Sequence, residues 1–150
     1  MRLSIGYPSK EQAKRLVEMK LSKQSEQTCK AEAMQVLTSQ EWLAYQEQVC
    51  QVKVSETLID YLVRITDMTR EPERFKLGAS PRAMLALLRA AQAKAFLENR
   101  TYCIPDDFLS MAEPVLAHRL IPAVSHTAKQ GTVNTILADG LRHIPVPVKH

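Results

Sequence analysis

An arginine in the middle of the chain has the setting of an anion-binding residue. Arg82 follows Ser80 and Pro81 at the predicted start of a long apolar helix, because serine is a favoured N-cap and proline is tolerated at the first helical position. Unpaired backbone N–H groups and the helix dipole favour an anion there, and a guanidinium adds a forked donor that matches phosphate oxygens. The alternatives are an unpaired surface arginine or one paired with Glu71 or Glu73. Chemistry alone leaves these alternatives open.

Other side chains that could do chemistry are better explained structurally. Asp106 and Asp107 directly follow a proline, so we interpret them as acids at the positive end of a helix dipole and not as an acid–base or metal pair. The histidines have no metal-ligand spacing. Cys50 and Cys103 lie in apolar stretches without a nearby histidine, which favours buried small side chains over nucleophiles. No metal site is therefore predicted.

Phosphate-binding loops made of glycine are missing from the sequence. It contains four glycines and none of the patterns G-x-x-x-x-G-K-[ST], G-x-G-x-x-G or G-x-S-x-G. Since a backbone cradle for phosphate needs such a loop, the sequence argues against a self-contained nucleotide-hydrolysing enzyme.

The elements that would position these residues are mostly helices. Residues 2–5 alternate polar and apolar, which predicts a short strand, and residues 22–35 are polar and indicate a loose connection. Leu120 to Pro122 are interpreted as the end of the compact part. Helices are predicted after capping boxes at Ser9 and Thr38, after the N-caps Ser55 and Ser80, from Pro105 through Leu116, and over about 132–143, with Asn99 ending the helix that starts at Pro81.

Composition agrees with a helical protein of the cytoplasm. Apolar residues make up 45% of the chain, charged residues 24% and aromatic residues 5%, which favours helices over a β-sandwich. There is no signal-peptide pattern and no apolar run of about 18 residues that could span a bilayer. Three widely spaced cysteines without C-x-x-C fit a reducing compartment.

The charge distribution leaves a second class of function open. The net charge is +4, and its surplus lies in residues 76–150, which hold 9 basic and 5 acidic side chains. A basic helical nucleic-acid-binding module is therefore an alternative, although no basic cluster is present and nucleic acid is an unlikely partner. The basic side chains of this half are scattered; six of them are Lys76, Arg82, Arg89, Lys94, Arg100 and Arg119.

A resemblance to a known family extends over most of the chain. The segment Gly78-Ala79-Ser80-Pro81-Arg82-Ala83 resembles the signature of the MoxR family of AAA+ ATPases. Further segments resemble that family in the same order, namely residues 2–9, 36–54, 99–107, 115–120 and 144–147. The joint pattern is more specific than any one segment.

The resemblance implies a mainly α fold, a helical-bundle AAA+ lid with a short remnant strand and linker helix from the ATPase core. It implies that Arg82 is the second sensor, the lid arginine that reaches the γ-phosphate, and that Tyr7 and Pro8 lie near the adenine. Ser80 belongs to the same expected nucleotide-binding set. The expected divisions are 1–21 for the end of the core, 22–37 for a mobile connection, 38–121 for the lid bundle and 122–150 for a helix and tail.

The resemblance further implies a parent ATPase that binds ATP and Mg²⁺, forms a ring (a hexamer is expected) and remodels or assembles a client protein. The chain would be a fragment of that parent, with its own AAA+ core and neighbouring subunits as partners and no membrane. Alone it is expected to bind no cofactor and to be inactive. A freestanding adaptor for partner proteins is the other alternative.

Overall fold

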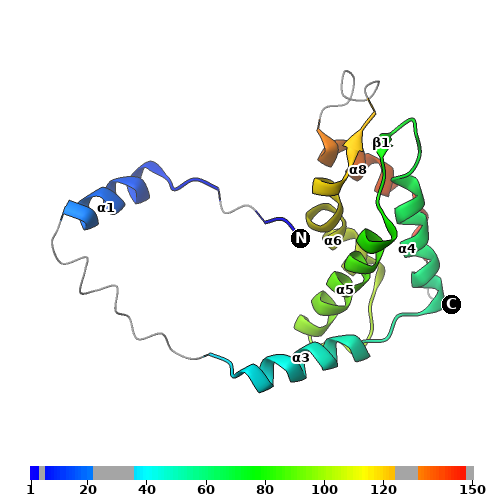
Figure 1. Cartoon of the computed structure of the whole chain (residues 1–150), viewed down its shortest axis with the longest axis horizontal. Coiled ribbons are helices and arrows are strands. Elements are labelled where there is room, and N and C mark those ends of the chain that lie inside the picture. Colours follow the sequence, from blue (N-terminus) through cyan, green and yellow to red (C-terminus); the bar gives the residue numbers. More distant parts are fainter. Residues whose placement is uncertain (4–5, 22–35, 124–131, 148–150) are drawn as a thin grey trace. The chain divides into compact units, whose positions relative to one another are not determined.

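The computed structural model describes residues 1–3, 6–21, 36–123 and 132–147. They form two compact units, one made of residues 3–42 and the other of residues 1–2 and 43–150. Within the described ranges the fold is mainly α-helical with one small antiparallel sheet (Figure 1). The elements are α1 (Lys10–Leu21), α3 (Ser39–Gln51), α4 (Glu56–Met68), β1 (Phe75–Leu77), α5 (Pro81–Leu97), α6 (Pro105–Leu116), the 3₁₀ turn η1 (Ala117–Arg119), β2 (Ile121–Pro122) and α8 (Val133–Arg142).

The predicted capping boxes open the first two helices. At α1 the Ser9 backbone N–H donates to Gln12 Oε1 at 2.9 Å, and the Gln12 N–H donates to Ser9 Oγ at 3.3 Å. At α3 the Thr38 N–H donates to Glu41 Oε2 at 2.7 Å and the Glu41 N–H donates to Thr38 Oγ1 at 3.2 Å. These reciprocal bonds satisfy N–H groups that a helix start otherwise leaves unpaired, so both predictions are confirmed.

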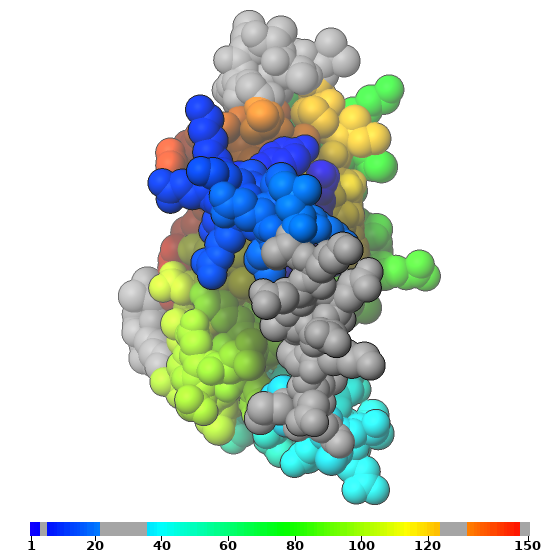
Figure 2. All heavy atoms as spheres, turned by 90° about the vertical axis from the view of Figure 1, so that its left-hand side faces the viewer, coloured from blue at the N-terminus to red at the C-terminus, as the bar shows by residue number. Residues whose placement is uncertain are grey.

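Helix α5 is central to the unit that contains the core. It packs against α6 and α4, and its buried residues are spaced at about one turn along one face, from Ala83 through Leu87 and Ala91 to Ala95. Another part of α5 reaches the molecular surface (lime green in Figure 2), and Leu85 is more than half exposed. Helix α5 is therefore the long helix that the sequence predicts from Pro81, although it is not buried on every side.

The compact part continues past the point where the sequence was expected to end it. Strand β2 pairs antiparallel with β1, with Phe75 opposite Pro122 and Leu77 opposite Ile121. Helix α8 then buries its apolar stripe in the same core, so ending the compact part at Pro122 was wrong. The core includes Tyr61 and Ile65 of α4, Leu87 of α5, Phe108 of α6, and Ile136 and Leu137 of α8.

Three expected features fall wholly or partly outside the described residues. The predicted strand at 2–5 includes the undescribed residues 4–5, while the Arg2 backbone N–H donates to the Pro114 carbonyl at 2.8 Å. The loose connection at 22–35 and Cys29 are not described. The domain divisions given above remain predictions.

Candidate functional site

The first turn of α5 is built as its sequence predicts. Ser80 has an extended backbone (φ −75°, ψ 163°), and its side-chain oxygen accepts the Ala83 backbone N–H at 3.2 Å. Pro81 occupies the first helical position, where its missing N–H costs no hydrogen bond. Ser80 is therefore the N-cap of α5, and it sets the position from which the Arg82 side chain leaves the helix.

The Arg82 side chain is exposed, and no hydrogen bond or ion pair holds it within the described residues. Glu71 is occupied by Arg74, whose Nε lies 2.7 Å from Glu71 Oε2. Glu73 forms no ion pair with Arg82 in the described structure either. The structure therefore disfavours the pairing alternative and leaves an unpaired guanidinium beside the start of a helix.

The loop before α5 is held by the end of α4. Thr69, the C-cap of α4, accepts the Ala79 N–H on its Oγ1 at 2.9 Å, and Arg70 Nε donates to the Ala79 carbonyl at 3.1 Å. Gly78 lies so close to this helix end that a Cβ there would be 2.4 Å from the Thr69 carbonyl oxygen and 2.9 Å from Arg70 Cα. The sequence carries no local signal for this close approach, because it involves residues about ten positions apart.

Tyr7 and Pro8 belong to the other unit. Both are exposed, and they follow Gly6, whose φ of 75° lies in the left-handed region that glycine adopts at little cost. The structure thus brings Ser80 and Arg82 together on one helix turn, whereas the expected role of Tyr7 and Pro8 near an adenine stays a prediction.

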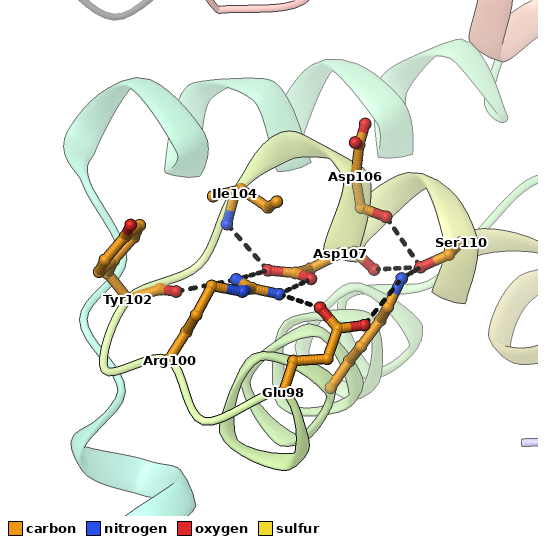
Figure 3. Close-up of polar contacts among 8 residues, drawn as sticks. Glu98, Arg100, Tyr102, Ile104, Asp106, Asp107 and Ser110 are labelled. Atoms are coloured by element: carbon orange, nitrogen blue, oxygen red, sulfur yellow. Dashed lines mark hydrogen bonds and ion pairs between the residues drawn. The ribbon is translucent and has the colours of Figure 1, made fainter.

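The other end of α5 is followed by a buried ion pair that the sequence did not predict (Figure 3). Arg100 donates to Asp107 in a bidentate arrangement, from Nη1 to Oδ2 at 2.7 Å and from Nη2 to Oδ1 at 2.6 Å. Arg100 Nη2 also reaches Glu98 Oε2 at 2.6 Å. Asp107 Oδ2 in addition accepts the Ile104 backbone N–H at 2.8 Å, so it does cap the start of α6 as expected. Its pairing with Arg100 gives it a second role.

The surroundings of this ion pair stabilise the charged forms of both Asp107 and Arg100. Burial alone would raise the pKa of Asp107, but hydrogen bonds from Arg100 and from the Ile104 N–H outweigh burial and lower that pKa below its ordinary value. The hydrogen bonds to Asp107 and Glu98 raise the pKa of Arg100 further above its ordinary value. A charge pair this deep needs such complete pairing, because a buried unpaired carboxylate is strongly unfavourable.

Two hollows in the described surface contain none of the predicted site residues. A groove of about 780 Å³ runs beside the start of α4 and contains none of Tyr7, Pro8, Ser80 and Arg82. Its lining includes Lys53, Leu58, Tyr102, Ile104 and Pro147. A smaller depression of about 420 Å³ borders the loop before α5, where Arg70, Lys76 and Gly78 line it.

The two described cysteines differ from each other. Cys103 is buried, and burial raises the pKa of its thiol to about 11, which keeps it protonated at neutral pH. Cys50 is exposed, so the prediction that it is a buried small side chain was wrong. The reason is that α3 has no buried residue in the described structure, and an apolar stretch on such a helix does not imply burial.

Most of the scattered basic residues already have partners. Lys94 and Arg100 lie in ion pairs, Arg89 donates to Gln92 Oε1 at 3.1 Å, and Arg119 Nε contacts His118. The described residues contain neither a group of three or more side chains suited to a metal ion nor a helix long and apolar enough to cross a membrane.

Comparison with known proteins identifies the fold. Residues 67–139 match the AAA lid domain family. The chain is 30% identical to YeaC, an uncharacterised protein of Bacillus subtilis, over 99% of this chain and 45% of YeaC. It is 29% identical to the chaperone MoxR1 of Mycobacterium tuberculosis, over 97% of this chain and 40% of MoxR1.

A solved structure shows the same architecture. A candidate ATPase from Cytophaga hutchinsonii superposes with a TM-score of 0.73 at 24% identity, over 96% of this chain and 45% of that protein. The chain spans less than half the length of each of these three proteins. The matched lid domain, the relatives along nearly the whole chain and the Gly78–Ala83 segment together show that the chain carries an AAA lid domain of the MoxR family.

Proposed function

We propose that this chain is the sensor-2 lid of a MoxR-type AAA+ ATPase, and that Arg82 contacts the γ-phosphate of ATP bound by the core of that enzyme. The observation that carries the proposal is the Arg82 guanidinium at the first turn of α5, which has no partner in the part of the chain that the structure describes. A phosphate ligand would satisfy its donors, and the positive end of the helix dipole would favour the same ligand.

Within this site the chain's own residues have distinct roles. Ser80 Oγ accepts the Ala83 N–H and so holds the helix start, while its hydroxyl proton has no acceptor in the described residues and can donate to a phosphate oxygen. Arg82 supplies a permanent positive charge that stabilises charge on the phosphoryl group being transferred. Tyr7 and Pro8 are proposed to border the adenine.

The remaining parts of the nucleotide site are assigned to the core. ATP and Mg²⁺ supply the transferable phosphoryl group and its charge neutralisation when they are bound to the complete enzyme. This chain contributes roughly one phosphate contact and no phosphate-binding loop, so we expect the isolated lid to be inactive and to show no micromolar ATP binding by calorimetry. Micromolar binding by the lid alone would contradict this division of labour.

The complete enzyme is proposed to act in the cytoplasm as a ring, expected to be a hexamer, in which this lid contacts its own core and a neighbouring subunit. Hydrolysis would move the lid as a rigid body and thereby remodel a client protein. The similarity to the chaperone MoxR1 supports this proposal. Neither a membrane nor a nucleic acid is a proposed partner.

The decisive experiment measures ATP turnover by the complete ATPase that carries this lid. We expect Arg82→Ala to lower kcat by on the order of 100-fold or more, because a positioned arginine stabilises transition-state charge. Arg64→Ala is the matched control, since Arg64 is an exposed arginine on α4 without an ion pair in the described structure. Wild-type turnover in Arg82→Ala would refute the proposed role.

A further inference from the structure

The loop before α5 is held by hydrogen bonds to both backbone polar groups of one residue, Ala79. Ala79 is buried, and each of its two backbone polar groups bonds to a different residue at the end of α4. Its N–H donates to Thr69 Oγ1 at 2.9 Å, and its carbonyl accepts from Arg70 Nε at 3.1 Å. We name these two bonds the Ala79 clamp.

Thr69 has little freedom to adopt another arrangement. Its side chain is fully buried, and its hydroxyl donates to the Thr66 carbonyl at 2.6 Å. Because the single hydroxyl proton is committed to Thr66, the lone pairs of the oxygen are left to accept from Ala79. The threonine thus joins the last turn of α4 to the loop before α5 with a fixed donor and a fixed acceptor.

Packing adds a second constraint on the same loop. A Cβ on Gly78 would lie 2.4 Å from the Thr69 carbonyl oxygen, so the loop approaches the helix end more closely than any other residue type allows. Arg70 is also oriented, since its Nη1 pairs with Asp67 Oδ1 at 3.0 Å while Nε reaches Ala79. Ser80 and Arg82 follow directly after the clamped residue.

From these contacts we infer that Thr69 and Arg70 are positioning residues for Arg82: the Ala79 clamp sets where the first turn of α5 begins and therefore where the Arg82 guanidinium reaches. This inference rests on the proposed function. Neither residue needs to touch the nucleotide. A displacement of the helix start by about 1 Å is enough to lower the rate of a reaction that depends on a positioned charge, by up to about 100-fold.

The first test uses the full chain alone and follows amide hydrogen exchange. Thr69→Val keeps the shape of the side chain and removes its hydroxyl, so we expect the Ala79 amide to exchange at least about tenfold faster, whereas Thr69→Ser should exchange like the wild type. Thr66→Val is the matched control, because Thr66 is also buried and its hydroxyl donates to the Leu62 carbonyl without contacting the loop. An unchanged Ala79 exchange rate in Thr69→Val would overturn the clamp.

The second test measures ATP turnover by the complete ATPase carrying the same variants. We expect Thr69→Val to lower kcat at least about tenfold, with Thr69→Ser restoring it and Thr66→Val leaving it unchanged. In an Arg82→Ala background Thr69→Val should cause a much smaller additional loss, because the Ala79 clamp acts mainly through the position of Arg82. An equal loss in both backgrounds would show a general structural effect and overturn the inference.

Outcomes for the two proposals remain separate. Normal turnover in Arg82→Ala would refute the proposed function itself. If turnover in Arg82→Ala is impaired but Thr69→Val has the same turnover as Thr66→Val, only the positioning role is refuted.

If Thr69→Val does not fold, Arg70→Ala replaces it, because this variant loses the bond from the exposed Arg70 side chain to the Ala79 carbonyl. We then expect kcat to fall at least about twofold. Arg64→Ala, which removes an exposed α4 arginine that has no ion pair in the described residues, is its control, and equal turnover of the two variants would overturn the inference.

Discussion

An arginine lies at each end of α5, Arg82 in its first turn and Arg100 just after its last residue, and the two side chains have opposite environments. Arg100, just beyond the C-terminal end, is bound to Asp107 and Glu98 and is largely buried. Arg82, in the first turn, is exposed and has no carboxylate partner in the described structure. The charge of Arg82 is therefore available to the phosphate that we propose as its ligand. The difference therefore separates a stabilising arginine from a candidate functional one.

Replacing each arginine by alanine is expected to give the largest difference in the free energy of unfolding between the two ends of α5. Arg100→Ala leaves Asp107 buried and uncompensated, so we expect the free energy of unfolding to fall by about 3 kcal/mol or more. Arg82→Ala should change it by less than about 0.5 kcal/mol, because an exposed unpaired side chain contributes little to stability. Chemical denaturation of both variants measures the contrast. Equal effects would remove the distinction between the two ends.

The ion pair also makes a prediction about pH. The folded-state pKa of Asp107 is lowered, so its contribution to stability is complete above the ordinary carboxyl pKa of about 3.9 and is lost as the pH falls through the lower folded-state value. Asp107→Asn should therefore be less stable than the wild type at pH 7, and the gap should narrow below about pH 4. Denaturation midpoints across pH 2–7 test this, and a constant gap would contradict it.

The starting end of α5 depends on a glycine that the other end does not need. Gly78→Ala places a Cβ against backbone atoms of Thr69 and Arg70 that cannot move aside, and we expect a loss of about 2 kcal/mol. Gly140→Ala is a useful control, because the atom it would meet is the flexible tip of Met68 and alanine favours a helix. Thermal denaturation should rank Gly78→Ala well below Gly140→Ala; the reverse order would show that the loop can relax.

The finishing end of α5 relies on a left-handed residue. Asn99 has φ 57°, and the Asn99 and Arg100 N–H groups donate to the Phe96 and Ala95 carbonyls at 2.9 Å each, which is a Schellman C-cap. Asn99→Ala should cost about 1 kcal/mol, while Asn99→Gly should change stability by only a few tenths. This smallest effect is measured by urea denaturation. A neutral alanine substitution would mean that the cap contributes nothing to holding Arg100 in place.

Local sequence was enough to predict where most helices begin and end. The side-chain oxygen of each N-cap residue accepts the backbone N–H three residues later, so the interaction depends only on nearby sequence; these residues are Ser9, Thr38, Ser55 and Ser80. Asn99 likewise ends α5 through bonds to residues of the preceding turn. Exposure was predicted less well, as Cys50 and the buried stripe of α8 show, because burial depends on which helices meet.

The sequence by itself determined the caps, the helical character and the setting of Arg82 at a helix start, since these depend on neighbours within a turn or two. Only the tertiary structure decided that Glu71 is taken by Arg74, that Arg100 is committed to Asp107, and that Thr69 clamps Ala79. Several side chains of each sign compete for partners near these positions, and their spacing in sequence does not rank them. The packing of α4, α5 and α6 decides between them, because it brings some charges within 3 Å of each other and leaves Arg82 without a partner among the described residues.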